Sequence, residues 1–251
     1  PVAYIGGAVL LLTALGFVEA TNDSAVCNEL VIDVDGRSDM HFLDADAVRA
    51  QVNDEVPVTG MALGELPIKQ IEDRLRTLPS VADADAYHTL DGKLHVRVRQ
   101  REPIVRVIDA NGHSFYIDKE GWTMPVSDTW TARVPVAVGN VFEPATSTGV
   151  RNVLVADTTA PNSRAALVFN AVLTLRSDPF WNAMIDQIAV LPDGQLELIP
   201  RVGPRRVQVG FGDKLHQHLA KLNVFYKQGI ANGDWRRYQR IDLRFANQVI
   251  A

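Results

Sequence analysis

Histidines and closely spaced carboxylates are the first residues in this chain of 251 that could do chemistry. His216-Gln217-His218 has a spacing found among metal ligands, but residues two apart on a helix point roughly 200° from each other. We interpret both histidines as solvated helix positions. Asp33/Asp35 and Asp83/Asp85 each place two carboxylates on one strand face, where acid–base work would also need a cleft and a perturbing environment. We interpret these four carboxylates as the exposed surface of an acidic module.

The remaining candidates for catalysis lack essential parts. Ser114 has neither the glycine pattern of a nucleophile elbow nor an adjacent histidine with a carboxylate. Gly210-Phe211-Gly212 precedes a helical pattern, but it lacks the full dinucleotide fingerprint. Cys27 is the only cysteine, which excludes an internal disulfide and a cysteine-rich zinc site. The sequence therefore predicts no enzyme, no cofactor, no metal and no small-molecule substrate.

A basic and aromatic cluster near the C-terminus is more informative, and it comprises Trp235, Arg236, Arg237, Tyr238, Arg240 and Arg244. One interpretation is a solvated turn and strand face. The other is a protein-docking surface, because Arg, Trp and Tyr dominate the energetics of interfaces. A final strand also commonly lies at a sheet edge, where its unpaired N–H and C=O groups can take up a partner strand.

Composition and charge describe a globular chain with two unlike parts. Apolar residues make up 47% and charged residues 22%, which excludes disorder. Residues 27–103 carry 9 Lys and Arg against 15 Asp and Glu, whereas residues 104–251 carry 16 against 13. An acidic first part and a mildly basic second part argue against nucleic acid as the main partner, because duplex binding requires a concentrated basic face.

Val2 to Val18 forms a run of seventeen residues without a charge. As a helix it would span about 26 Å, slightly less than a bilayer core. A single-pass anchor, a cleaved signal peptide and a buried core helix are the alternatives. No basic n-region of a signal peptide is visible, and the lack of a polar face disfavours the core helix, so the anchor is favoured. Glu19 and Asp23 follow, with no Lys or Arg before Arg37, so the positive-inside rule places the rest outside the membrane.

The elements after this run predict a small α+β module. Leu30–Val34 is a strand, and helices follow with Val48 and Val52, then Ile71 and Leu75, at four-residue spacing. Two further strands flank the Asp91-Gly92 turn and cover residues 81–87 and 93–100. The order strand, helix, helix, strand, strand predicts two helices on one face of a three-stranded sheet.

Arg101-Glu102-Pro103 interrupts the last of these strands and is predicted to be a hinge, because proline has no N–H to donate. The part that follows is predicted to be β-rich with two helices, at residues 164–176 and 214–228. The short strand at residues 134–139 is expected at a sheet edge because it contains Pro135. Ile241 to Phe245 is a final strand, which Gln248-Val249-Ile250 could extend.

Five landmarks follow one another along the chain: Ile71-Glu72-Asp73-Arg74-Leu75, Leu78-Pro79-Ser80-Val81-Ala82-Asp83-Ala84, the run from Leu94 to Val107, Gly112 to Gly121 with Met124-Pro125, and Tyr238 to Phe245. In this order they resemble the FtsQ/DivIB family of bacterial cell-division proteins, whose ectodomain begins with a POTRA module. The resemblance implies an α+β fold with a transmembrane anchor at residues 1–20, a POTRA domain (β-α-α-β-β) at 21–103 and a β domain at 104–251.

The same resemblance implies a function. FtsQ-like proteins are scaffolds of the divisome in the inner membrane, with the ectodomain in the periplasm at the division septum, and they recruit FtsB and FtsL. Other divisome proteins could contact the POTRA domain. The FtsB contact is made by strand addition at the last strands of the β domain. The matching positions here are Arg240, Ile241, Asp242, Leu243, Arg244, Phe245, Ala246, Asn247, Gln248 and Val249.

Two other functions stay open as alternatives. A POTRA-bearing component of outer-membrane protein assembly or secretion would act as a chaperone for polypeptide strands, and it would carry repeated POTRA modules followed by long alternating strands of about ten residues. An enzyme such as a cell-wall hydrolase would need a clustered carboxylate, histidine or serine site, which the sequence does not assemble.

Overall fold

Two separate hydrophobic cores divide the chain between Arg101 and Glu102. The computed structural model describes residues 25–36, 40–54, 57–128, 130–142, 150–155, 163–230, 238–246 and 248–251. The predicted anchor therefore lies outside the described residues, as do Trp235, Arg236, Arg237 and Asn247. Among the residues that are described, no helix is long and apolar enough to span a bilayer.

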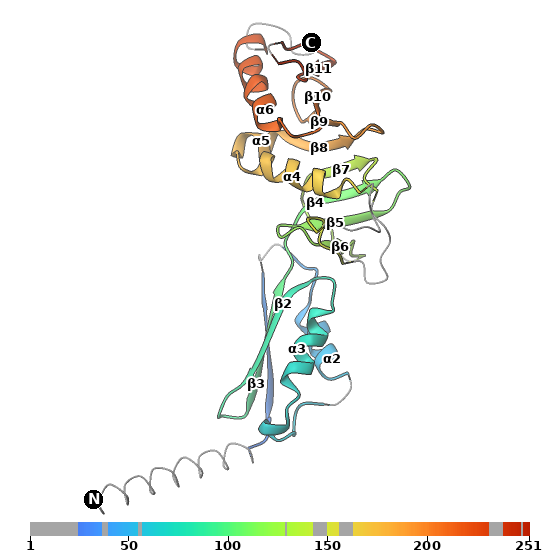
Figure 1. The fold of residues 1–251 in the computed structure, drawn as a ribbon. Coiled ribbons are helices and arrows are strands. Elements are labelled where there is room, and N and C mark those ends of the chain that lie inside the picture. Colours follow the sequence, from blue (N-terminus) through green and yellow to red (C-terminus); the bar gives the residue numbers. More distant parts are fainter. Residues whose placement is uncertain are drawn as a thin grey trace, which may run out of the picture. The chain divides into compact units, whose positions relative to one another are not determined.

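The first unit contains a three-stranded sheet in the order β1-β3-β2 (Figure 1). Strand β3 (Lys93–Gln100) is central, parallel to β1 (Glu29–Asp35) and antiparallel to β2 (Val81–His88). The predicted turn joins β2 to β3, and Gly92 adopts a φ of 84° there. A Cβ on Gly92 would lie 2.9 Å from the carbonyl oxygen of Val26, so glycine is required for both conformation and space.

Two helices cover one face of this sheet, as the apolar spacing predicted (Figure 1). Helix α2 (Ala45–Val52) begins after Asp44, whose carboxylate accepts a hydrogen bond from the N–H of Asp46. Helix α3 (Ile68–Arg76) follows a short 3₁₀ turn, η1 (Leu63–Glu65). Val48 and Val52 on α2 and Ile71 and Leu75 on α3 are buried against the alternating residues Leu94, Val96 and Val98 of β3. The strand-helix-helix-strand-strand order is confirmed.

The second unit is built on an eight-stranded sheet in the order β11-β10-β9-β8-β7-β4-β5-β6. Strands β4, β7 and β8 run parallel, β10 is parallel to β11, and the remaining neighbours are antiparallel. The strands are β4 (Pro103–Asp109), β5 (Ser114–Asp118), β6 (Thr123–Pro125), β7 (Val136–Gly139), β8 (Ile185–Val190), β9 (Leu196–Pro200), β10 (Arg206–Gly210) and β11 (Arg240–Asp242).

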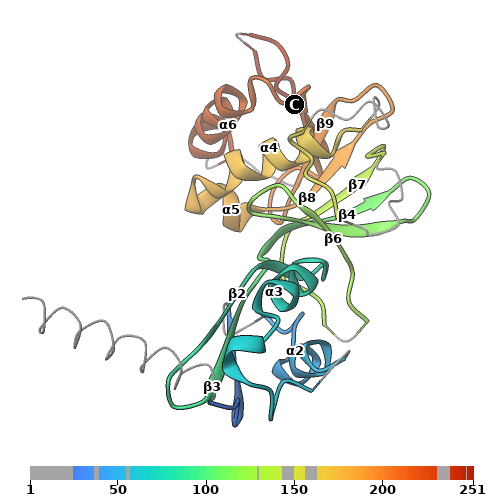
Figure 2. The ribbon, with the colours of Figure 1, turned by 60° about the horizontal axis from the view of Figure 1, so that its bottom comes forward.

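Helices α4 (Ala165–Arg176) and α6 (Leu215–Val224) pack on one face of the sheet (Figure 2). The prediction of two helices omitted α5 (Pro179–Met184), which is only six residues long. Its signal is local: Asp178 accepts a hydrogen bond from the N–H of Phe180, and Pro179 occupies the first turn. Helix α6 also continues into a π-helical segment, η2 (Phe225–Ile230).

Strand β7 is not at an edge, and the prediction that placed it there was wrong. It pairs with β4 on one side and β8 on the other. Pro135 precedes the strand, which begins at Val136, so the missing proline N–H falls outside the ladder. The carbonyl of Pro135 still accepts a hydrogen bond from the N–H of Arg106, 2.9 Å away.

Gly139, at the end of β7, generates a test of this packing. Its φ is 104°, and a Cβ there would lie 2.5 Å from the carbonyl oxygen of Val190 on β8. We expect Gly139→Ala to lower the free energy of unfolding by about 2 kcal/mol or more, because strain and overlap with backbone act together. Urea denaturation followed by tryptophan fluorescence reports on this unit, since all four tryptophans follow residue 102.

Gly112→Ala is the matched control for this prediction. Gly112 has a similar φ of 86°, but its Cβ would have no neighbour within 4 Å. Only the strain of the left-handed conformation applies there, at about 1 kcal/mol. Equal destabilisation by the two variants would contradict the close approach of β7 to β8.

Candidate functional site

The short strand β11 ends the sheet at the position where the sequence predicted a docking edge. It pairs with β10 in parallel, with Ile241 beside Val207 and Asp242 beside Gln208. Ile241 and Leu243 point into the hydrophobic core and are fully buried. Their side chains anchor the strand and are inaccessible to a partner. Arg240, Arg244, Phe245, Ala246 and Gln248 are exposed, and Asp242 and Val249 are partly buried.

A buried carboxylate holds β11 to its neighbours. Glu197 on β9 is only 2% exposed. Its Oε2 lies 3.0 Å from Nη1 of Arg206 on β10, and its Oε1 lies 3.1 Å from Nη2 of Arg240 on β11. The two guanidinium groups compensate the burial of the carboxylate, which would otherwise be strongly unfavourable. The Glu197 carboxylate therefore joins three strands, and the first role of Arg240 is to position the edge.

Arg244 is engaged in the same way at the other end of β11. Its guanidinium binds Asp242 through Nε and Nη2, at distances of 2.6–3.1 Å, and its Nη1 donates to Oε1 of Gln195, 2.9 Å away. The hydrogen bond from Arg244 holds the pKa of Asp242 below its usual range, and Asp242 raises the pKa of Arg244. This pair keeps the carboxylate charged at neutral pH.

The outward-facing backbone of β11 is already paired at one residue. Leu243 donates its N–H to Gln208 on β10, whereas the N–H and C=O of Asp242 face away and bond to Ile250 at 2.7 and 3.2 Å. The expectation that residues 248–250 extend the strand was wrong, because the chain turns back. The Lys221 ammonium contributes to this turn by donating to the carbonyl of Phe245, 2.7 Å away.

A cavity of about 420 Å³ lies beside the end of β11 and the start of α6. Two aromatic rings on its lining are exposed, Phe211 at 58% and Phe245 at 47%. Arg244, Lys214 and Asp213 add charged groups to the same lining. An apolar hollow with a polar rim next to a strand edge is the arrangement expected of a protein-docking site.

His218 also lines this cavity, contrary to its interpretation as a solvated residue. It is buried, and its Nδ1 donates to the carbonyl of Val209, 3.0 Å away. Burial, together with nearby Lys221, lowers the pKa of His218, so the ring is neutral at pH 7. His216 is exposed. The two histidines do point apart on α6, and this geometry is what buries one of them.

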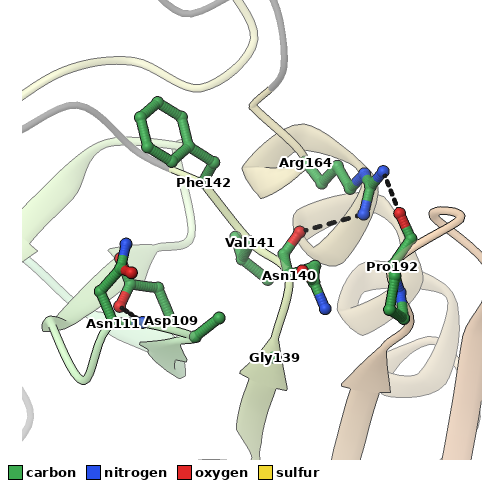
Figure 3. A pocket seen from close by; sticks show the side chains of 9 residues that line it. Asp109, Asn111, Gly139, Asn140, Val141, Phe142, Arg164 and Pro192 are labelled. Carbon is green, nitrogen blue, oxygen red and sulfur yellow. Dashed lines mark hydrogen bonds between the residues drawn. The ribbon is translucent and has the colours of Figure 1, made fainter.

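A second cavity, of about 330 Å³, lies at the carboxyl ends of β4, β7 and β8 (Figure 3). The Arg164 guanidinium lines it but donates to the carbonyls of Leu191 and Pro192, at 2.8 and 2.9 Å. The Asp109 carboxylate accepts the N–H groups of Asn111 and His113 in its own turn. Both charged groups thus serve the fold, which makes this cavity a weaker candidate than the one beside β11.

The other predicted chemistry-bearing residues lie apart from these cavities. On β2, Asp83 is partly buried and Asp85 is exposed, and they lie 3.2 and 3.9 Å from the guanidinium of Arg76. The Ser114 hydroxyl accepts a hydrogen bond from Arg106. Within the described ranges, no three His, Cys, Asp or Glu side chains lie close enough together to hold a metal ion.

The Asp242–Arg244 pair predicts a pH dependence. Because the pKa of Asp242 is lowered in the folded chain, its contribution to stability is complete above its unfolded pKa of about 4 and is lost as pH falls through the folded pKa. The difference in unfolding free energy between the parent and Asp242→Asn should be constant above about pH 5 and shrink below pH 4. Urea titrations between pH 3 and pH 7 measure it, and a difference that does not change with pH would contradict the pairing.

Comparisons with known proteins agree with this architecture. Residues 102–251 match the family model described as FtsQ/DivIB, C-terminal related, and residues 25–99 match the model of a POTRA-like domain. The first match begins at the residue where the second unit begins.

Two relatives named Cell division protein FtsQ cover most of the chain. The protein of Rhodothermus marinus is 30% identical over 201 residues, which span 76% of this chain and 67% of the relative. The protein of Salinibacter ruber is 27% identical over 198 residues, which span 76% and 71%. From the family-model match over the whole second unit and this coverage of named relatives, the chain belongs to the FtsQ/DivIB family of cell-division proteins.

Proposed function

We propose that this chain is a non-enzymatic scaffold of the divisome, which recruits FtsB- and FtsL-type partners by strand addition at β11. In this proposal it is anchored in the bacterial inner membrane by residues 1–20, with both described units in the periplasm at the septum. The uncharged run from Val2 to Val18 and the names of the relatives support this placement. The observation that carries the docking site is an edge strand next to a hollow with two exposed aromatic rings.

The strand edge supports the mode of binding. β11 is three residues long, and in the described part of the chain its outer side pairs only through the bridge between Asp242 and Ile250. Because this bridge involves only one residue of β11, the outward-facing N–H and C=O groups on either side of it can hydrogen-bond to an added strand. A partner strand can pair with the returning segment around Ile250, or with β11 itself after displacing that segment.

The charged and the aromatic side chains at this edge have different roles. Arg240 and Arg244 bind Glu197 and Asp242 within the unit, so they hold the edge in place. Phe211 and Phe245 offer apolar surface to a partner, and aromatic residues in such hollows commonly dominate binding energy. Charge reversal at Arg240 would therefore be a poor test of docking, because it would place a second carboxylate beside the buried Glu197.

The exposed rings provide a cleaner test. We expect the double variant Phe211→Ala/Phe245→Ala to weaken binding of an FtsB-like ectodomain at least tenfold, about 1.4 kcal/mol, because the rings contact the partner. Its unfolding free energy should stay within about 1 kcal/mol of the parent, since both rings are exposed. Calorimetric titration of the full chain with the partner ectodomain measures the affinity.

Phe142→Ala is the matched control, because Phe142 is a half-exposed phenylalanine of the same unit that lines the other cavity. It should bind the partner as the parent does. If the double variant and the control bind equally well, the docking site is not at this edge. If the folded parent fails to bind FtsB- and FtsL-like ectodomains, the scaffold proposal itself fails.

The alternative of a chaperone in outer-membrane protein assembly has no specific observation in its favour. It predicted long alternating strands of about ten residues, whereas the strands in the described part of the second unit run from three to seven residues. Contacts of the POTRA-like unit with other divisome proteins stay part of the proposal.

A further inference from the structure

We propose that side chains of the first unit close the outer edge of β2 against strand addition. We call this set of side chains the edge latch, and it consists of Glu72 and Arg76 on α3 together with Asp83 on β2. The proposal goes beyond the docking at β11 and does not depend on it. It concerns the other unit, a different sheet edge, and the exclusion of a strand instead of its uptake.

Strand β2 lies at an edge of the three-stranded sheet. The strand order is β1-β3-β2, and β3 is the only strand that pairs with β2 in the described part of the chain. Its eight residues make β2 longer than β11, which has three. Residues of an antiparallel strand direct their N–H and C=O groups alternately toward the neighbour and away from it. A long edge with open outward groups would be a template for another strand or for a second copy of the chain.

The outward-facing groups in the middle of β2 are occupied by side chains. The C=O of Ala84 accepts a hydrogen bond from Nη2 of Arg76, and the N–H of Ala84 donates to Oδ1 of Asp83, 2.9 Å away. The N–H of Ala86 donates to Oε1 of Glu72, also at 2.9 Å. An added strand would need these same backbone groups, so it would have to displace the side chains first.

The members of the edge latch also bond to one another. Nη1 of Arg76 lies 3.4 Å from Oε2 of Glu72, which is four residues earlier on α3. Nε of Arg76 donates to Oδ1 of Asp83 at 3.2 Å. Slight burial opposes the ionisation of Asp83, but the hydrogen bond from Arg76 holds its pKa below the usual range. One guanidinium thus binds two carboxylates and a backbone carbonyl, which fixes all three side chains over the edge.

Small residues on β2 allow this close approach of the helix. Ala84 and Ala86 are buried in the core of the first unit, and α3 lies beside the strand (Figure 2). A larger side chain at either position would push α3 away, because protein cores are close-packed. Asp83, between the two small residues Ala82 and Ala84, points away from the core and completes the edge latch.

The edges at β2 and β11 differ in what covers them. At β11 the returning main chain pairs with one residue, Asp242. At β2 charged side chains hold the outward groups of two residues, Ala84 and Ala86. Hydrogen bonds to charged groups are stronger than those between neutral groups. A strand that must displace several of them is therefore disfavoured at β2.

A peptide with the sequence of β3 tests the proposal in the full 251-residue chain. The probe is fluorescein-labelled KLHVRVRQ, residues 93–100, which already pairs with the inner side of β2. In that pairing Arg97 and Arg99 stand beside Asp85 and Asp83, so the probe suits the charge of β2. Its affinity for the chain is measured by fluorescence anisotropy.

Opening the edge latch should create binding of this probe. We expect Glu72→Ala/Arg76→Ala to bind it at least tenfold more tightly than the parent, because the outward groups of Ala84 and Ala86 become available. The change leaves the net charge unaltered, and alanine is the best helix former, so α3 should persist. Cooperative thermal unfolding followed by circular dichroism checks that the variant is folded.

Two controls separate strand addition from other effects. Glu65→Ala/Lys69→Ala also removes one acid and one base, at exposed positions outside the edge latch, and it should bind the probe as the parent does. A second peptide with proline in place of Val96 has the same charges but lacks one backbone N–H. It should bind Glu72→Ala/Arg76→Ala no better than it binds the parent.

The single variants Glu72→Ala and Arg76→Ala should each give a smaller gain in affinity, and they keep the test decisive if the double variant does not fold. Equal binding of the probe by the parent and the folded variants would overturn the proposal. So would an equal gain with the proline peptide, which would assign the gain to charge alone. An equal gain in Glu65→Ala/Lys69→Ala would also overturn it, because the edge latch would then have no specific role.

Discussion

The ion pairs of one buried carboxylate hold the C-terminal edge of this protein together. The guanidinium groups of Arg206 and Arg240 reach the buried Glu197 carboxylate from the next two strands and compensate its burial. β11 has only three residues, so its backbone hydrogen bonds are few. The bridge to Glu197 and the burial of Ile241 and Leu243 therefore fix where the last segment lies.

This constraint changes how the C-terminal basic cluster is understood. Two interpretations were open for Arg240 and Arg244, a solvated strand face and a docking surface. In the structure both guanidinium groups form ion pairs within the unit, Arg240 with Glu197 and Arg244 with Asp242. Both arginines therefore position the edge strand. The surface that they position is apolar, and its exposed rings, Phe211 and Phe245, come from elements far apart in the sequence.

Much of the fold could be predicted because its signals are local. The four-residue spacing in α2 and α3, the alternation in β3 and the Asp91-Gly92 turn all act within a few residues of the chain. The predictions failed where the outcome depends on contacts with distant segments of the chain, or where an element is too short to show a period. β7 is central because β4 and β8 both pair with residues 136–139, which follow Pro135. Helix α5 was missed because six residues are too short to show a helical period.

The sequence by itself determined the order of elements in the first unit, the family resemblance and the position of the last strand near Ile241. Only the tertiary structure decided that the His218 side chain faces the interior and that the segment around Ile250 folds back to pair with Asp242. It also decided which residues meet at each surface. The physical reason is that periodicity records which face of an element is apolar. It does not record which other element covers that face, because that depends on contacts such as Glu197 with Arg240 and Phe180 with Tyr226, which are 43 and 46 residues apart.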